Sequence, residues 1–93
     1  MSDEFKKNAD SVKAFTPNPE IYKGLVDKLG YALRSDIDSL VSVVYGRASM
    51  AQELGVITWD QFEKINIIAI RYYANGGTHR HERAERAFNE MEW

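Results

Sequence analysis

The sequence contains no cysteine, only two prolines and no long apolar run. The lack of cysteine excludes disulfides, thiolate catalysis, zinc fingers and cysteine-ligated clusters, and it fits a reducing compartment. The longest apolar stretch runs from Ile65 to Ala74, is interrupted by Asn66 and Arg71, and falls short of the roughly 18 residues that span a membrane. The first residues lack the apolar core of a signal peptide. We therefore expect a soluble, cytoplasmic protein.

The sequence also lacks a strong excess of charge of either sign. The 93 residues include 12 Lys and Arg and 14 Asp and Glu, which gives a net charge of −2. Domains that bind nucleic acid over a broad surface are normally basic, and mimics of DNA are much more acidic than this. With 44% hydrophobic and 28% charged residues, the composition is that of an ordinary globular protein. We expect residues 1–93 to form a single domain.

Apolar residues recur at helical spacing along the chain, which predicts an all-α bundle of four to five helices. We expect helices over about residues 3–15, 19–34, 36–54, 59–74 and 79–91. The first has an apolar side of four residues and is too short to be stable unless it docks on something. Those residues are Phe5, Ala9, Val12 and Phe15.

Local signals predict where the helices begin and end. Short polar side chains cap helix N-termini, and glycine is favoured where a helix ends in a left-handed residue. The prolines of Thr16-Pro17-Asn18-Pro19 separate the first two helices. The expected caps are Asn18, then Ser35 or Asp36, then Thr58 in a capping box with Gln61, and finally Thr78; the expected stops are Gly55 and the run Asn75-Gly76-Gly77.

The fourth expected helix, about 59–74, is apolar almost all round. Such a helix lies either at the centre of its bundle or against a partner. We expect it at the centre of this bundle, with a second subunit as the candidate for any surface left over. The residues expected to make a partner or self-association surface are Trp59, Ile67, Ile70 and Tyr73.

A locally basic segment follows this helix. Two glycines that lead into a helix N-terminus offer free backbone N–H groups to an anion, and arginines add charge-assisted bonds. The candidate anion or nucleic-acid residues are Gly76, Gly77, Thr78, Arg80, Arg83 and Arg86. The alternative is a helix stop, a cap and a solvated face, and the glycine spacing matches no phosphate-binding loop.

Two further sequence patterns are weaker indications of function: a helix-turn-helix corner and two histidine pairs. Met50 to Val56 is typical of a helix-turn-helix corner, but acidic Asp60 and Glu63 begin the helix that would enter the DNA groove. His81 with Glu85, and His79 with Glu82, are spaced to share a helix face. A stable metal site needs three or four ligands, so we expect no metal and no cofactor.

Nothing in the sequence resembles a nucleophile held beside an oriented base, so we expect no enzyme. Short helical chains of this kind are typical of bacterial and phage accessory proteins. We expect a non-enzymatic protein-interaction module, an adaptor or inhibitor of a larger protein, that forms a homodimer. The first alternative is an anion, nucleotide or nucleic-acid binding module that uses the basic segment. The second is a helix-turn-helix regulator.

Overall fold

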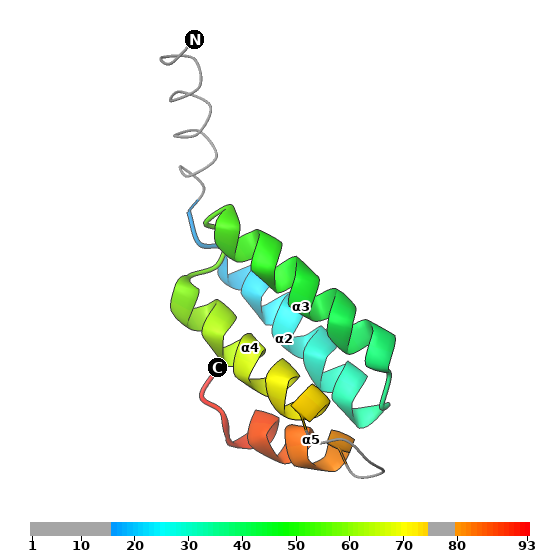
Figure 1. Ribbon diagram of the computed structural model, residues 1–93. Coiled ribbons are helices and arrows are strands. Elements are labelled where there is room, and N and C mark those ends of the chain that lie inside the picture. The colour runs from blue at the N-terminus through cyan, green and yellow to red at the C-terminus, as the bar shows by residue number, and fades with distance from the viewer. Residues whose placement is uncertain (1–15, 75–79) are drawn as a thin grey trace, which may run out of the picture.

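The computed structural model describes residues 16–74 and 80–93, and within these ranges the regular secondary structure is all α-helix, with no strand. It contains α2 (Pro19–Arg34), α3 (Asp38–Glu53), α4 (Trp59–Ala74) and α5 (Arg80–Glu90) (Figure 1). The all-α prediction is confirmed. The helix expected over residues 3–15 and the Asn75-Gly76-Gly77 stop with its Thr78 cap lie outside the described residues. Among the residues that are described, none belongs to a helix long and apolar enough to cross a membrane.

The start of α2 follows from the Asn18-Pro19 pair. Asn18 is extended, and its Oδ1 accepts a hydrogen bond of 2.9 Å from the N–H of Glu20. Pro19 then occupies the first helical position, where its missing N–H costs nothing. The backbone N–H of Asn18 also donates to the carbonyl of Val56 at 2.7 Å. The start of α2 is therefore attached to the turn that connects α3 and α4.

The turn between α2 and α3 differs from the expected one. Ser35 is the C-cap of α2, Asp36 adopts a left-handed φ of 50°, and Ile37 is the N-cap of α3 without a side-chain cap. Neither Ser35 nor Asp36 therefore caps α3, and the prediction that one of them does is wrong. The carboxylate of Asp36 instead accepts a hydrogen bond from Tyr72 on α4. Because Asp36 is left-handed and Ile37 is extended, both lie outside the helix, and α3 begins at Asp38.

The turn between α3 and α4 matches its prediction. Gly55 has a φ of 79° and provides the left-handed residue that follows α3. The N–H of Thr58 donates to Gln61 Oε1 at 2.9 Å, and the N–H of Gln61 donates to Thr58 Oγ1 at 3.1 Å. This reciprocal pair is the predicted capping box.

The four helices pack in a ring. α2 packs on α3, α3 on α4, α4 on α5, and α5 on α2, and Figure 1 shows α2, α3 and α4 lengthwise side by side. In such a ring every helix has an outer face, so the expectation that α4 lies at the centre is not confirmed. The fully enclosed side chains come from all four helices: Leu29, Ala32, Leu33, Val41, Val44, Ala48, Ile65, Ile68, Tyr72 and Ala84.

The C-terminal residues close the ring against α2. Trp93 donates from its indole nitrogen to the carbonyl of Phe88 at 2.9 Å, and the two rings lie 4.9 Å apart. Trp93 also lies 6.5 Å from the ring of Tyr22 on α2. Phe88 approaches α2 at Gly30, where an added Cβ would lie 2.9 Å from the Phe88 ring. Because Gly30 has no side chain, α5 can pack closely on α2 at this residue.

Candidate protein-interaction surface

The four residues expected to face a partner are all exposed. The exposed fractions are 59% for Trp59, 39% for Ile67, 55% for Ile70 and 46% for Tyr73. Each of these is an apolar or aromatic side chain whose burial would be favourable. The surplus apolar character of α4 is therefore on the surface of the protein rather than inside the ring.

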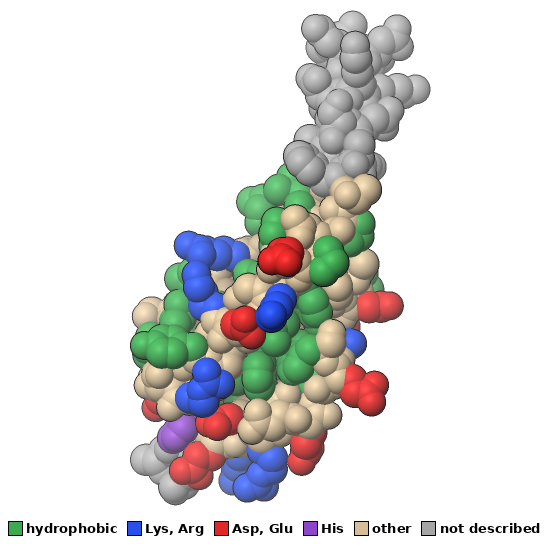
Figure 2. Space-filling model, turned by 180° about the vertical axis from the view of Figure 1, so that it is seen from behind, with side chains coloured by type: hydrophobic (Ala, Val, Ile, Leu, Met, Phe, Trp, Pro, Cys, Tyr) green, Lys and Arg blue, Asp and Glu red, His purple; other side chains and the backbone are tan. Residues whose placement is uncertain are grey.

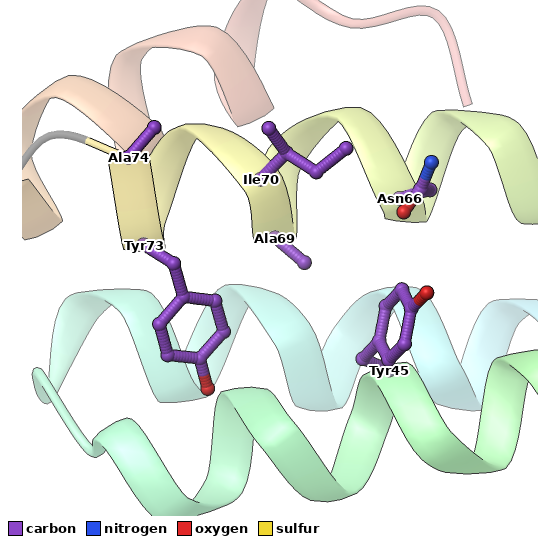
Figure 3. A pocket seen from close by; sticks show the side chains of 6 residues that line it. All are labelled: Tyr45, Asn66, Ala69, Ile70, Tyr73 and Ala74. Atoms are coloured by element: carbon purple, nitrogen blue, oxygen red, sulfur yellow. The ribbon is translucent and has the colours of Figure 1, made fainter.

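Two of the four line a groove between α3 and α4 (Figure 3). The groove has a volume of about 470 Å³. Tyr73 and Tyr45 stand at its two ends with Ala69 between them, and both rings bridge the space between the helices. The lining residues are Tyr45, Asn66, Ala69, Ile70, Tyr73 and Ala74. None of them is charged, which suits an apolar occupant.

Trp59 is connected to the groove through Phe62. The rings of Trp59 and Phe62 lie 5.7 Å apart, and those of Phe62 and Tyr45 lie 5.8 Å apart. Both pairs are tilted, a favourable arrangement of aromatic rings. Since Phe62 is buried, it gives the two exposed rings a common support. The result is an aromatic row that continues the groove toward the start of α4.

Tyr73 is held at the other end of the groove. Its hydroxyl donates to the backbone carbonyl of Asp38 at the start of α3, at 3.2 Å. Its ring also meets the buried Tyr72 ring edge-on, at 5.3 Å and 89°. These contacts hold the Tyr73 side chain in place in the unbound protein. A side chain that is already ordered loses less conformational entropy on binding.

Trp59, Ile70 and Tyr73 were among the residues expected at a partner surface, whereas Tyr45 was not. Tyr45 is 40% exposed and lies beside the buried stripe of α3 rather than in it. Its spacing from Val41, Val44 and Ala48 gives that position, but nothing in the spacing shows that α4 is the neighbour. Ile67 is exposed but does not line the groove.

We define the interaction surface as the groove together with Trp59. Other exposed apolar residues are Ile21 and Tyr31 on α2, and Val43 and Met50 on α3; scattered residues of this kind are normal on a protein surface.

Figure 2 shows the face of the molecule opposite to the view of Figure 1. On that face, acidic and basic side chains are interspersed between apolar ones, unlike the uncharged lining of the groove.

The basic segment is described only in part. Gly76, Gly77 and Thr78 lie outside the described residues, and Arg80 is the first residue of α5. Arg83 and Arg86 line a second hollow of about 340 Å³ together with Ala87, Glu90 and, from α4, Arg71. Arg71 was not among the predicted anion residues, because only the packing of α5 on α4 brings it beside the other two arginines.

Of the two histidine pairs, the one that the structure describes in full is His81 with Glu85. Across residues 16–74 and 80–93, no three His, Asp, Glu or Cys side chains are grouped so as to hold a metal ion. His81 instead places its Nδ1 3.8 Å from Oδ2 of Asp36 in the turn between α2 and α3. His79 lies outside the described residues.

The chain matches no protein-family model, no curated protein and no solved structure.

Proposed function

We propose that this protein is a non-enzymatic interaction module, of the adaptor or inhibitor kind, which binds a protein partner at the α3–α4 groove and also associates with itself there. The observation that carries the proposal is an uncharged groove with exposed Trp59, Ile70 and Tyr73 along one side of α4. Tryptophan and tyrosine are enriched among the residues that dominate binding energy in protein interfaces.

The energetics support such a role. Fully burying a large apolar side chain contributes about 1.5–3 kcal/mol. Trp59, Ile70 and Tyr73 together could therefore offset much of the entropic cost of association, which is of the order of 4–15 kcal/mol. Because none of the lining residues is charged, binding at this groove should change little with salt concentration.

Light scattering on a sizing column tests the proposal over a range of protein concentrations at low and high salt. We expect a salt-insensitive dimer that dissociates when Ile70 is replaced by Asp. Ile21→Asp is the matched control, because it places the same charge on an exposed isoleucine of α2, outside the groove. A protein that stays monomeric at millimolar concentration would contradict the self-association. A dimer unaffected by Ile70→Asp would contradict the assignment of the groove.

A second candidate function is anion binding, and the convergence of Arg71, Arg83 and Arg86 favours it. Guanidinium groups bind phosphate or carboxylate by charge-assisted hydrogen bonds. Glu90 also lines this hollow and lowers its net positive charge. Binding of inorganic phosphate or an oligonucleotide that weakens steeply with salt, and is lost in Arg83→Glu with Arg86→Glu, would support this function.

Helix-turn-helix DNA binding is the third candidate and has the least support. α4 would be the recognition helix, yet its outer surface carries Asp60 and the apolar residues Trp59 and Ile70. Recognition helices need polar or basic side chains against phosphates and base edges. A gel-shift assay that detects a preferred duplex sequence would revive this function.

A further inference from the structure

We propose that a hollow between α2 and α3 binds a small amphiphilic acid, that is, an apolar molecule with one carboxylate. The two helices lie side by side (Figure 1), and the hollow between them has a volume of about 370 Å³. Pockets for small molecules typically measure about 300–1,000 Å³. The hollow shares no residue with the α3–α4 groove, so this inference goes beyond the proposed function and does not depend on it. The lining residues are Ile21, Gly24, Leu25, Lys28, Arg47 and Ala51.

The floor of the hollow is apolar. Ile21, Gly24 and Leu25 are spaced three and four residues apart, so they share one face of α2. No side chain or neighbouring helix among the described residues comes within 4 Å of a Cβ placed at Gly24, and the space beside Ile21 therefore stays open. Ile21 is 43% exposed, and its burial under an apolar ligand would be favourable.

Two cations line the same hollow from different helices, Lys28 from α2 and Arg47 from α3. Among the described residues no acidic side chain lines the hollow, and neither cation forms an ion pair or a hydrogen bond with any of them. Like charges on neighbouring helices repel each other, and an anion between them removes that repulsion. The guanidinium group also matches a carboxylate in geometry and binds it by charge-assisted hydrogen bonds.

The two parts of the lining together define the class of ligand. A fully polar anion would leave the floor in water, and a neutral apolar molecule would leave Lys28 and Arg47 without an anion. A molecule with an apolar body and one carboxylate makes use of both parts. From Ile21 to Lys28 the strip is about 10 Å long, at 1.5 Å per residue, which suits a chain the size of octanoate. The hollow at Arg83 differs, because Glu90 lines it.

Titration of the full-length protein with octanoate, followed by amide chemical shifts in NMR, tests the site. We expect saturable shifts at the lining residues Gly24, Lys28, Arg47 and Ala51. Acetate supplies the carboxylate without the chain, and 1-octanol supplies the chain without the charge. Each should bind at least about 10-fold more weakly than octanoate, because each lacks one of the two contributions. Inorganic phosphate or acetate that binds as well as octanoate would overturn the inference.

A pair of charge variants tests the role of the cations. Lys28→Gln with Arg47→Gln should weaken octanoate binding at least about 10-fold, because the charge-assisted bonds are lost. Lys23→Gln with Arg34→Gln is the matched control: it changes the net charge equally, at residues that do not line the hollow, and should leave the affinity unchanged. Equal weakening in the two variants would show a general effect of net charge and would overturn the inference.

A pair of glycine variants tests the shape of the hollow. Gly24→Leu should fill it and abolish the saturable shifts. Gly46→Leu is the matched control, because Gly46 is also an exposed helical glycine with open space around it, but it lies outside the hollow. Thermal unfolding of both variants checks that the bundle still folds. Octanoate binding that survives Gly24→Leu, or that shifts Tyr45 and Ile70 in place of the hollow, would overturn the inference.

Discussion

The hydroxyl of Tyr72 donates a hydrogen bond of 2.6 Å to Oδ1 of Asp36, thirty-six residues earlier in the chain. Tyr72 is fully buried near the end of α4, and Asp36 occupies the left-handed position of the turn between α2 and α3. The other oxygen of the same carboxylate lies 3.8 Å from His81 on α5. One carboxylate therefore connects the turn to two helices that are distant in sequence, at the end of the bundle farthest from Trp59.

Replacing Tyr72 by Phe should lower the free energy of unfolding by about 1–2 kcal/mol, the net contribution of a hydrogen bond to a charged acceptor that is itself partly hydrated. Chemical denaturation of both proteins measures the difference. Tyr22→Phe is the matched control, because the buried Tyr22 hydroxyl has no hydrogen-bond partner among the described residues. That variant should be as stable as the parent or more so. Equal losses in the two variants would contradict this account.

The glycines of α2 should respond in opposite directions to alanine. Gly30→Ala should destabilise the protein by about 1–3 kcal/mol, the usual cost of overpacking, because its Cβ would lie 2.9 Å from a Phe88 ring that Trp93 holds in place. At Gly24, no side chain or neighbouring helix among the described residues comes within 4 Å of the corresponding position. Gly24→Ala should therefore stabilise the helix by about 0.5–1 kcal/mol. Thermal unfolding of the two variants measures both changes, and a stabilising Gly30→Ala would show that α5 does not pack on α2 at this residue.

Alkaline pH should destabilise the fold through Tyr22. Burial disfavours the phenolate and raises the pKa of Tyr22 above its ordinary value of 10.0. The folded protein therefore holds this proton to a higher pH than the unfolded chain does. Its contribution to stability is complete below pH 10 and is lost as the pH rises through the raised pKa. Urea unfolding between pH 8 and pH 11 should show a decline that is smaller in Tyr22→Phe; an equal decline in both proteins would contradict this.

The parts of the fold that could be predicted from the sequence are those decided within a few residues. The Asn18 cap and the Thr58–Gln61 capping box depend on side chains no more than three residues from the backbone that they serve. The left-handed Gly55 depends only on the absence of a Cβ at that residue. Helical spacing likewise separates the buried side of a helix from its exposed side. These features hold whatever the neighbouring helices are.

The features that could not be predicted depend on contacts between distant segments. Nothing near Asp36 in the sequence shows that its carboxylate accepts a hydrogen bond from Tyr72, so the local residues predict a helix cap at Ser35 or Asp36. The composition of α4 gives the amount of apolar surface but not the helices that cover it. For the same reason, the sequence does not show that Tyr45 and Tyr73 line one groove, or that Arg71 and Arg83 line one hollow. The two residues of each pair come from different helices.

Amide chemical shifts of the full chain, recorded by NMR at increasing protein concentration, test the interaction surface most directly. We predict concentration-dependent shifts at Tyr45, Asn66, Ile70 and Tyr73, unchanged by salt and absent in Ile70→Asp. Shifts confined to α2, for example around Tyr31, would contradict the account, as would spectra that do not change with concentration.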